Sequence, residues 1–250
     1  LSEYKNILAA MEERLLFDSR DVELAKLELK KETQLEIDTK NELNKFRDPK
    51  KNEKEQLNIE HAGLVNKIKQ LTSRDKKDLI AINFTKSSLQ RTEALMTLVE
   101  RELLLLDAKK DVADLKLKIK EIQFKMLELR YKLKTEKLSI RELFSSYKNQ
   151  KDLETSLLKS FKEKRIEAVN SLVETQREIS AIDIKIEKVQ RSRSGALSQN
   201  QGFVNKIIEN FEETKRILNY LSIVTQDFLA VCSDLIHQQT SVLNYYDLIL

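Results

Sequence analysis

Cys232 and His237 are the one pair of side chains that could act as a nucleophile and a nearby general base. On a helix, five residues of separation places two side chains about 140° apart, so this spacing does not let the imidazole reach the thiol. Cys232 also falls on an apolar seam, where a cysteine packs as a small hydrophobic residue. We therefore expect packing for Cys232, and a surface position for His61, the second of two histidines.

Other sequence motifs of catalysis are missing. The chain has no glycine-rich phosphate loop, no HExxH and no GxSxG motif. One cysteine and two histidines are too few for a structural zinc site or a disulfide framework. Tyr245 and Tyr246 could be phosphorylated, but the position of Tyr246 on the seam favours packing. We expect no enzyme activity, no cofactor, no metal and no small-molecule substrate.

The composition predicts an all-α chain of long amphipathic helices that pair as an elongated antiparallel coiled coil or helical bundle. The chain has only 3 Gly and 1 Pro in 250 residues, so it has few of the residues that tight turns require. Charged residues make up 34%, against about 25% in an ordinary domain, as expected of solvated helix surfaces. The single cysteine favours a reducing, cytoplasmic location, and no apolar run is long enough to cross a bilayer. The start at Leu1 suggests a piece of a longer protein.

Three interruptions divide the predicted domain, which covers residues 1–250. Asp48 and Pro49 suit the cap and first position of a helix, so we predict that a first helix over 2–46 ends before them. A loop over 192–202 contains two of the three glycines. A change in the phase of the apolar repeat predicts a break over 144–152, and hence central helices over 50–143 and 152–191 and a last helix over 203–248. The polar run 72–77 has capping residues but no Gly or Pro, and we place no boundary there.

Apolar residues spaced alternately by three and four form seams typical of coiled coils. The last helix carries a second apolar line beside its seam, which favours a bundle of three or more helices. Another seam runs from Leu157 to Val189. The predicted packing or oligomer seam consists of Val112, Ile119, Ile122, Met126, Leu129, Leu133, Phe211, Leu218, Leu221, Phe228, Leu235 and Val242.

The middle of the chain is basic and both ends are acidic. A basic run could contact phosphates of lipid headgroups, and comprises Lys116, Lys118, Lys120, Lys125, Arg130, Lys132 and Lys134. The alternative is an ordinary solvated face, because Glu121 and Lys125, and Glu128 and Lys132, have the spacing of supporting pairs within a helix. Nucleic acid is a less favoured partner, since no aromatic residues for base stacking are interleaved with the charges.

The C-terminal stretch resembles the last helix of BAR domains, especially the sorting-nexin type. The residues that carry the resemblance are Asn210-Phe-Glu-Glu-Thr-Lys-Arg-Ile-Leu-Asn-Tyr-Leu221 and His237-Gln-Gln-Thr-Ser-Val-Leu-Asn-Tyr-Tyr246. They cover about 45 of the 250 residues. The resemblance implies an antiparallel homodimer that binds curved anionic membranes through basic residues of the central helices, such as Lys116, Lys118 and Lys125. BAR domains have three main helices, whereas this chain is predicted to have four or more segments.

Two functions follow from these observations. The first is a non-enzymatic structural or interaction protein, a scaffold or tether in an intracellular assembly, whose partners are a second copy or other coiled-coil proteins. The alternative is a BAR-like homodimer that binds and shapes anionic membranes and is peripheral on them.

Overall fold

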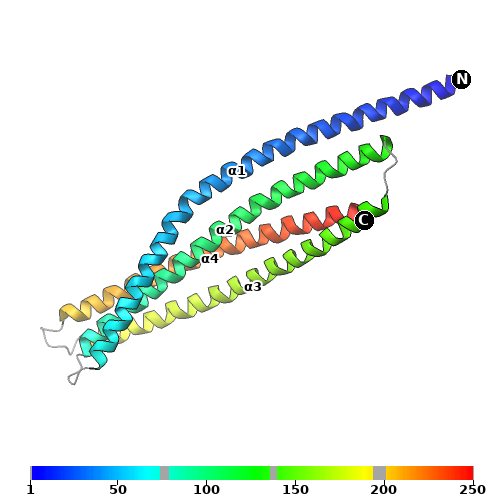
Figure 1. The fold of residues 1–250 in the computed structure, drawn as a ribbon. Coiled ribbons are helices and arrows are strands. Elements are labelled where there is room, and N and C mark those ends of the chain that lie inside the picture. The colour runs from blue at the N-terminus through cyan, green and yellow to red at the C-terminus, as the bar shows by residue number, and fades with distance from the viewer. Residues whose placement is uncertain (1, 74–78, 136–139, 194–200, 250) are drawn as a thin grey trace. The chain divides into compact units, whose positions relative to one another are not determined.

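The computed structural model contains four long α-helices (Figure 1). They are α1 (Ser2–Thr72), α2 (Leu79–Thr135), α3 (Ile140–Arg193) and α4 (Gln201–Ile249). The structure describes the backbone of residues 2–73, 79–135, 140–193 and 201–249, and the side chains of residues 19–73, 79–132, 147–191 and 201–248. No strand occurs in these residues. The predicted all-α fold class is confirmed.

The described chain forms two compact units, each assembled from separate parts of the sequence. Unit 1 comprises residues 1–43, 108–164 and 231–250, and unit 2 comprises residues 44–107 and 165–230. Since all four helices contribute residues to both units, each unit is a bundle built from parts of long helices rather than from a continuous stretch of chain.

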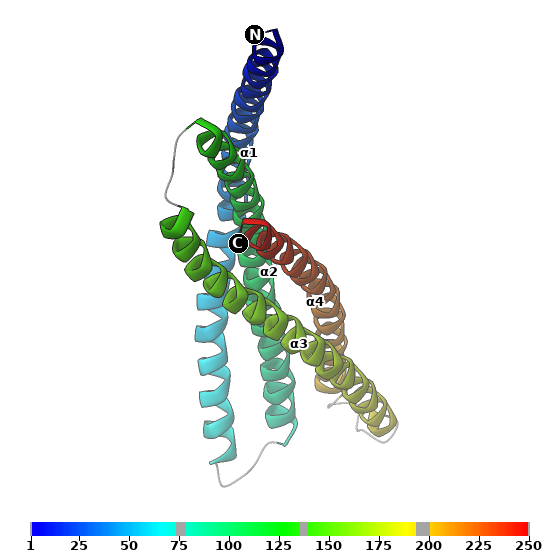
Figure 2. The same ribbon diagram turned by 90° about the vertical axis from the view of Figure 1, so that its right-hand side faces the viewer.

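The helices of unit 2 alternate in direction. Lys54 Nζ lies 3.0 Å from a Glu100 carboxylate oxygen, and Lys50 lies 2.8 Å from Glu102. Residue numbers along α2 fall as those along α1 rise, so the two helices are antiparallel, as seen for the cyan and green-blue segments of Figure 2. Helices α2 and α3 are antiparallel by the same criterion, because Arg101 donates a hydrogen bond to Ser171 and Lys185 donates one to Gln90. Helices α3 and α4 are also antiparallel, because Gln176 donates to Ser222 and Lys215 donates to Asp183.

Unit 1 has the same alternation. Lys40 contacts Asp114 and Lys120 contacts Glu28, which makes α1 antiparallel to α2. Tyr246 donates a hydrogen bond to Gln150 and Gln239 donates to Glu154, which makes α3 antiparallel to α4. Because α4 is the second neighbour of α2 in this sequence of alternating directions, the two run parallel.

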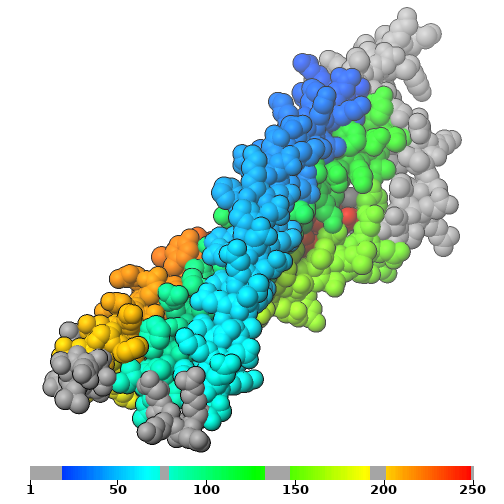
Figure 3. Space-filling view, turned by 60° about the vertical axis from the view of Figure 1, so that its left-hand side comes forward, coloured from blue at the N-terminus to red at the C-terminus, as the bar shows by residue number. Residues whose placement is uncertain are grey.

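Among the described residues, α4 contributes more buried apolar side chains to the core of each unit than any other helix. Its buried apolar side chains in unit 2 include both the predicted seam and the second line beside it: Ile207, Ile208, Ile217, Leu218, Leu221, Val224 and Phe228. In unit 1 they continue with Cys232, Leu235, Val242 and Tyr246. Helix α1 buries far less. Its segment in unit 2 includes the cyan surface of Figure 3, and Phe46 and Ile59 of this segment are exposed. The predicted bundle of three or more helices around the last helix is confirmed.

The predicted end of the first helix at residue 46 is wrong, because α1 continues through Pro49 to Thr72. Proline in a helix interior is unfavourable by about 3 kcal/mol. Contacts of α1 with α2 on both sides of Pro49 oppose this cost, since Arg47 pairs with Asp107 and Lys50 with Glu102. The boundary that was placed at Pro49 therefore does not exist.

The predicted helical stretch over 50–143 is not one helix, because this range belongs to α1, α2 and the start of α3. Helix α1 ends in the polar run on which the sequence places no boundary. There the hydroxyls of Thr72 and Ser73 donate to the carbonyls of Ile68 and Gln70 at 2.9 and 3.0 Å. The bond from Ser73 satisfies a carbonyl that the helix end leaves unpaired.

The predicted break over 144–152 is wrong as well, since α3 runs without interruption from Ile140 to Arg193. The phase of the apolar repeat changes because its two halves belong to different helices, α2 and α3. The predicted last helix over 203–248 is α4, which begins two residues earlier and ends one later. Of the predicted loop 192–202, residues 192–193 and 201–202 are helical, and residues 194–200 lie outside the described part of the chain.

Candidate interaction surface

Helix α3 has two opposite apolar faces in unit 2. One face carries Ala168, Thr175 and Ile182, all buried, and belongs to the predicted seam. At 100° per residue these three side chains point about 180° away from a second set. That set, which we call the outer stripe, consists of Ile166, Val169, Val173 and Ile184, exposed by 62%, 44%, 47% and 54%. Within the outer stripe the side chains fall inside about 60° of one another.

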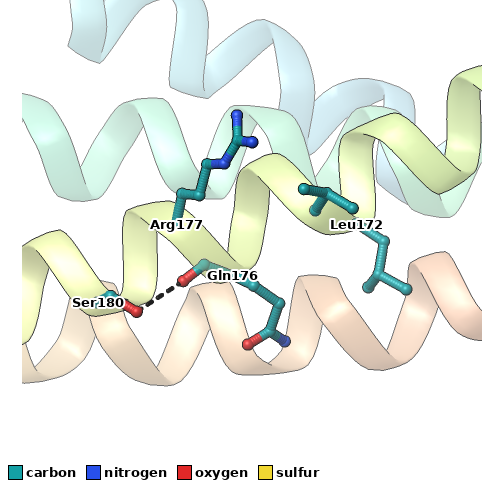
Figure 4. A pocket seen from close by; sticks show the side chains of 5 residues that line it. Leu172, Gln176, Arg177 and Ser180 are labelled. Carbon is teal, nitrogen blue, oxygen red and sulfur yellow. Dashed lines mark hydrogen bonds between the residues drawn. The ribbon is translucent and has the colours of Figure 1, made fainter.

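A shallow open hollow of about 410 Å³ lies along the outer stripe (Figure 4). It is lined by Leu172, Val173, Gln176, Arg177 and Ser180. The Ser180 hydroxyl donates to the Gln176 carbonyl at 3.1 Å, and the Gln176 amide donates to the Ser222 hydroxyl of α4 at 3.2 Å. In Figure 4 the Gln176 side chain points toward α4 and that of Arg177 points away from it. The hollow therefore has one edge held by α4 and one charged edge open to solvent.

Charged side chains border the outer stripe on both sides. Helical geometry places Glu174 and Arg177 along one flank, and Arg165 and Glu187 along the other. All four are exposed. Arg191 contacts Glu187 at 3.3 Å, but both are so exposed that this pair contributes little to stability. An apolar stripe with charges of both signs on each flank is the pattern of a helix face that pairs with another helix.

Glu178, one turn from Glu174, has a raised carboxyl pKa, because neighbouring atoms displace water from it and because Glu174 and Glu93 repel its charge. Since its pKa is higher in the folded chain than in the unfolded chain, ionisation of Glu178 opposes folding as the pH rises through that pKa. We expect Glu178→Gln to raise the melting temperature at pH 7 by about 1–2 °C, and to change nothing near pH 3.5, where the acid is protonated in both states. Calorimetry measures this, with Glu167→Gln as the control. An equal gain at both pH values would contradict the argument.

The predicted seam residues lie at different depths. Ile122, Leu218, Leu221, Phe228, Leu235 and Val242 are buried. Val112, Ile119, Met126, Leu129 and Phe211 are half-buried, and the side chain of Leu133 lies outside the described residues. Phe211 is covered by Lys185, whose Nζ lies 5.8 Å from the ring centre. The α4 seam is thus internal to the chain, and the α2 seam is covered only in part.

The predicted basic run does not form one face of α2. Lys116, Lys120 and Arg130 lie on one side of the helix, whereas Lys118, Lys125 and Lys132 lie about 180° away. Lys118 pairs with Glu154, Lys120 with Glu28 at 2.9 Å and Lys132 with Glu128 at 3.1 Å. Lys134 lies outside the described side chains. Among those described, Lys116, Lys125 and Arg130 are exposed and are divided between the two sides.

The residues considered for chemistry lie apart. Cys232 is fully buried and His237 is exposed, on different faces of α4. His61 lies 3.4 Å from a Glu93 carboxylate oxygen at the half-exposed contact of α1 and α2. Tyr246 is buried, with its ring centre 6.2 Å from that of Tyr147, and Tyr245 accepts a hydrogen bond from Gln123. The described residues contain no group of three or more metal-binding side chains.

The outer stripe is not among the residues predicted from the sequence. Its signal is an apolar line at spacings of three, four and eleven residues, beside the Leu157 to Val189 seam. The second line of the last helix was recognised by the same reasoning, so the pattern could have been found in α3. Periodicity does not indicate which of two apolar lines a helix buries.

Within the described part of the chain, no helix contains a stretch long and apolar enough to span a membrane. The chain matches no protein-family model, no curated protein and no solved structure.

Proposed function

We propose that this chain is a non-enzymatic helical scaffold or tether that binds partner helices through apolar faces which its own bundles leave exposed. The outer stripe of α3 is the observation that carries the proposal. Four branched apolar side chains on one line, each more than two fifths exposed, are an unfavourable surface for a helix that has no partner.

The bundle supports the proposal because it holds the stripe rigidly. The opposite face of α3 is buried, and the helix is tied to α2 by the bond from Arg101 to Ser171 at 2.7 Å and to α4 by Lys215 and Asp183 at 2.6 Å. A helix that is packed against its neighbours on the opposite face can receive another helix with little further loss of conformational entropy. This is the property that a scaffold needs.

The test compares partner capture by two variants of the same chain. Replacing both Ile166 and Ile184 with Ser removes the ends of the outer stripe, whereas Ile59→Ser removes an isoleucine of α1 that is 74% exposed and lies outside the stripe. We expect proteins retained by the immobilised wild-type chain to be lost from the double variant and kept by the control, as quantified by mass spectrometry. Equal retention by all three chains would overturn the proposal. Vesicles containing anionic lipid, included in the same assay, test membrane binding directly.

A further inference from the structure

We propose that the outer stripe of α3 pairs with the outer stripe of a second copy of this chain, in an antiparallel and two-fold symmetric contact centred at Thr175–Gln176. This inference rests on the proposed function and names the partner. The order of apolar and charged residues along α3 supports this pairing.

The apolar ends of the stripe are placed symmetrically. Ile166 and Ile184 each lie nine residues from Thr175, on opposite sides of it. When two copies of α3 run antiparallel about this point, Ile166 of each copy meets Ile184 of the other. Val169 then meets the small Ser180 and Ala181, and Val173 meets the aliphatic part of Arg177, which covers apolar surface while its charge stays in water.

The flanking charges are symmetric, with opposite sign, about points that lie within one residue of Thr175. Glu174 and Arg177 lie on either side of the Thr175–Gln176 pair, on one flank of the stripe. Arg165 and Glu187 each lie eleven residues from Gln176, on the other flank. In an antiparallel pair related by a two-fold axis, like flanks meet. With Ile166 level with Ile184, Glu174 lies within one residue of level with Arg177 of the other copy, and Arg165 lies within two residues of level with Glu187. These offsets of about 1.5 and 3 Å leave the long side chains in reach of each other, which makes four attractive pairs.

A parallel pair lacks this complementarity. It would place every residue level with its own copy and bring opposite flanks together, so Glu174 of one copy would no longer lie opposite Arg177 of the other. Charges at flanking positions specify the orientation and partner of paired helices.

The proposed antiparallel contact would extend from residue 165 to residue 187, about 33 Å of helix. Because Arg177 and Ser180 interrupt the apolar line, we expect a reversible dimer with a dissociation constant in the micromolar range.

Sedimentation equilibrium up to about 200 µM tests whether the dimer exists. We expect a mass that rises from 29.3 kDa toward twice that value. The Ile166→Ser, Ile184→Ser double variant should dimerise at least about tenfold more weakly, and Ile59→Ser should behave as the wild type. A wild-type chain that stays monomeric would overturn this inference. The proposed function would still stand if partner capture depended on the stripe, and would fail separately if it did not.

Charge variants test the orientation, and mixing them excludes effects within one chain. Arg177→Glu alone and Glu174→Arg alone each bring like charges together across the contact, so each should weaken dimerisation about tenfold or more. A mixture of the two variants forms a heterodimer in which acidic residues of one chain meet basic residues of the other. We expect this mixture to dimerise within about threefold of the wild type. Failure of the mixture to recover would overturn the proposed pairing.

Cysteine cross-linking tests the register. We expect oxidation of a mixture of the Ile166→Cys and Ile184→Cys chains to give a disulfide-linked heterodimer, because these positions meet in the proposed contact. Ile166→Cys alone should give no cross-linked dimer, since the two copies of that position are then about 27 Å apart along the helix. The wild type, whose Cys232 is buried, is the control. Cross-linking of Ile166→Cys alone would indicate a parallel pair and overturn the proposal.

Discussion

Replacing Phe228 with Ala is expected to lower the free energy of unfolding by about 3–5 kcal/mol, the range for a buried phenylalanine. Phe228 is only 4% exposed and lies in the α4 core of unit 2. The Arg101 guanidinium lies 5.6 Å from the centre of its ring and also donates to Ser171 at 2.7 Å. Truncation would leave a cavity and also remove a contact between a cation and an aromatic ring, which is worth roughly 1 kcal/mol.

Urea unfolding followed by helical circular dichroism measures this loss. Tyr220→Ala is the matched control, because it removes another aromatic residue of α4 that is 50% exposed. The control should change the free energy of unfolding by less than about 1 kcal/mol. Similar losses in the two variants would contradict the burial of Phe228.

Glu154→Ala is expected to lower the free energy of unfolding by about 2–4 kcal/mol, because it leaves one N–H of a buried amide without an acceptor. Gln239 is fully buried on α4, and its amide donates to the Glu154 carboxylate at 2.8 Å and to the Glu154 carbonyl at 2.9 Å. Lys118 of α2 pairs with the same carboxylate. Glu154 thus joins three helices of unit 1.

A double-mutant cycle with Gln239→Ala separates this contact from the general cost of truncation. We expect the two losses to be clearly less than additive, and the Glu154→Leu, Gln239→Leu double variant to be more stable than Glu154→Ala, because apolar replacement removes both polar groups together. Glu163→Ala, which removes an exposed α3 glutamate 4.0 Å from Lys159, serves as the control and should cost less than about 0.5 kcal/mol. Strict additivity of Glu154→Ala and Gln239→Ala would contradict the coupling.

The buried contact between Gln239 and Glu154 shows which part of a polar interaction can be predicted from the sequence. The repeat placed Gln239 on the seam of the last helix, and the structure buries it there. The repeat could not provide its partner, because Glu154 is 85 residues away and reaches Gln239 only after α3 folds back along α4. The same holds for Lys118, which the sequence assigns to a basic run and the structure pairs with Glu154.

The sequence by itself determined that the chain is helical and that the last helix is buried. Both properties depend on local patterns, namely the scarcity of Gly and Pro and the spacing of apolar residues along one helix. Only the tertiary structure decided where the helices end and which faces stay exposed. Pro49 remains inside α1 because contacts with α2 lie on both sides of it. Helix α3 has two apolar lines, and the positions of α2 and α4 determine that Ala168 and Ile182 are buried while Ile166 and Ile184 remain exposed.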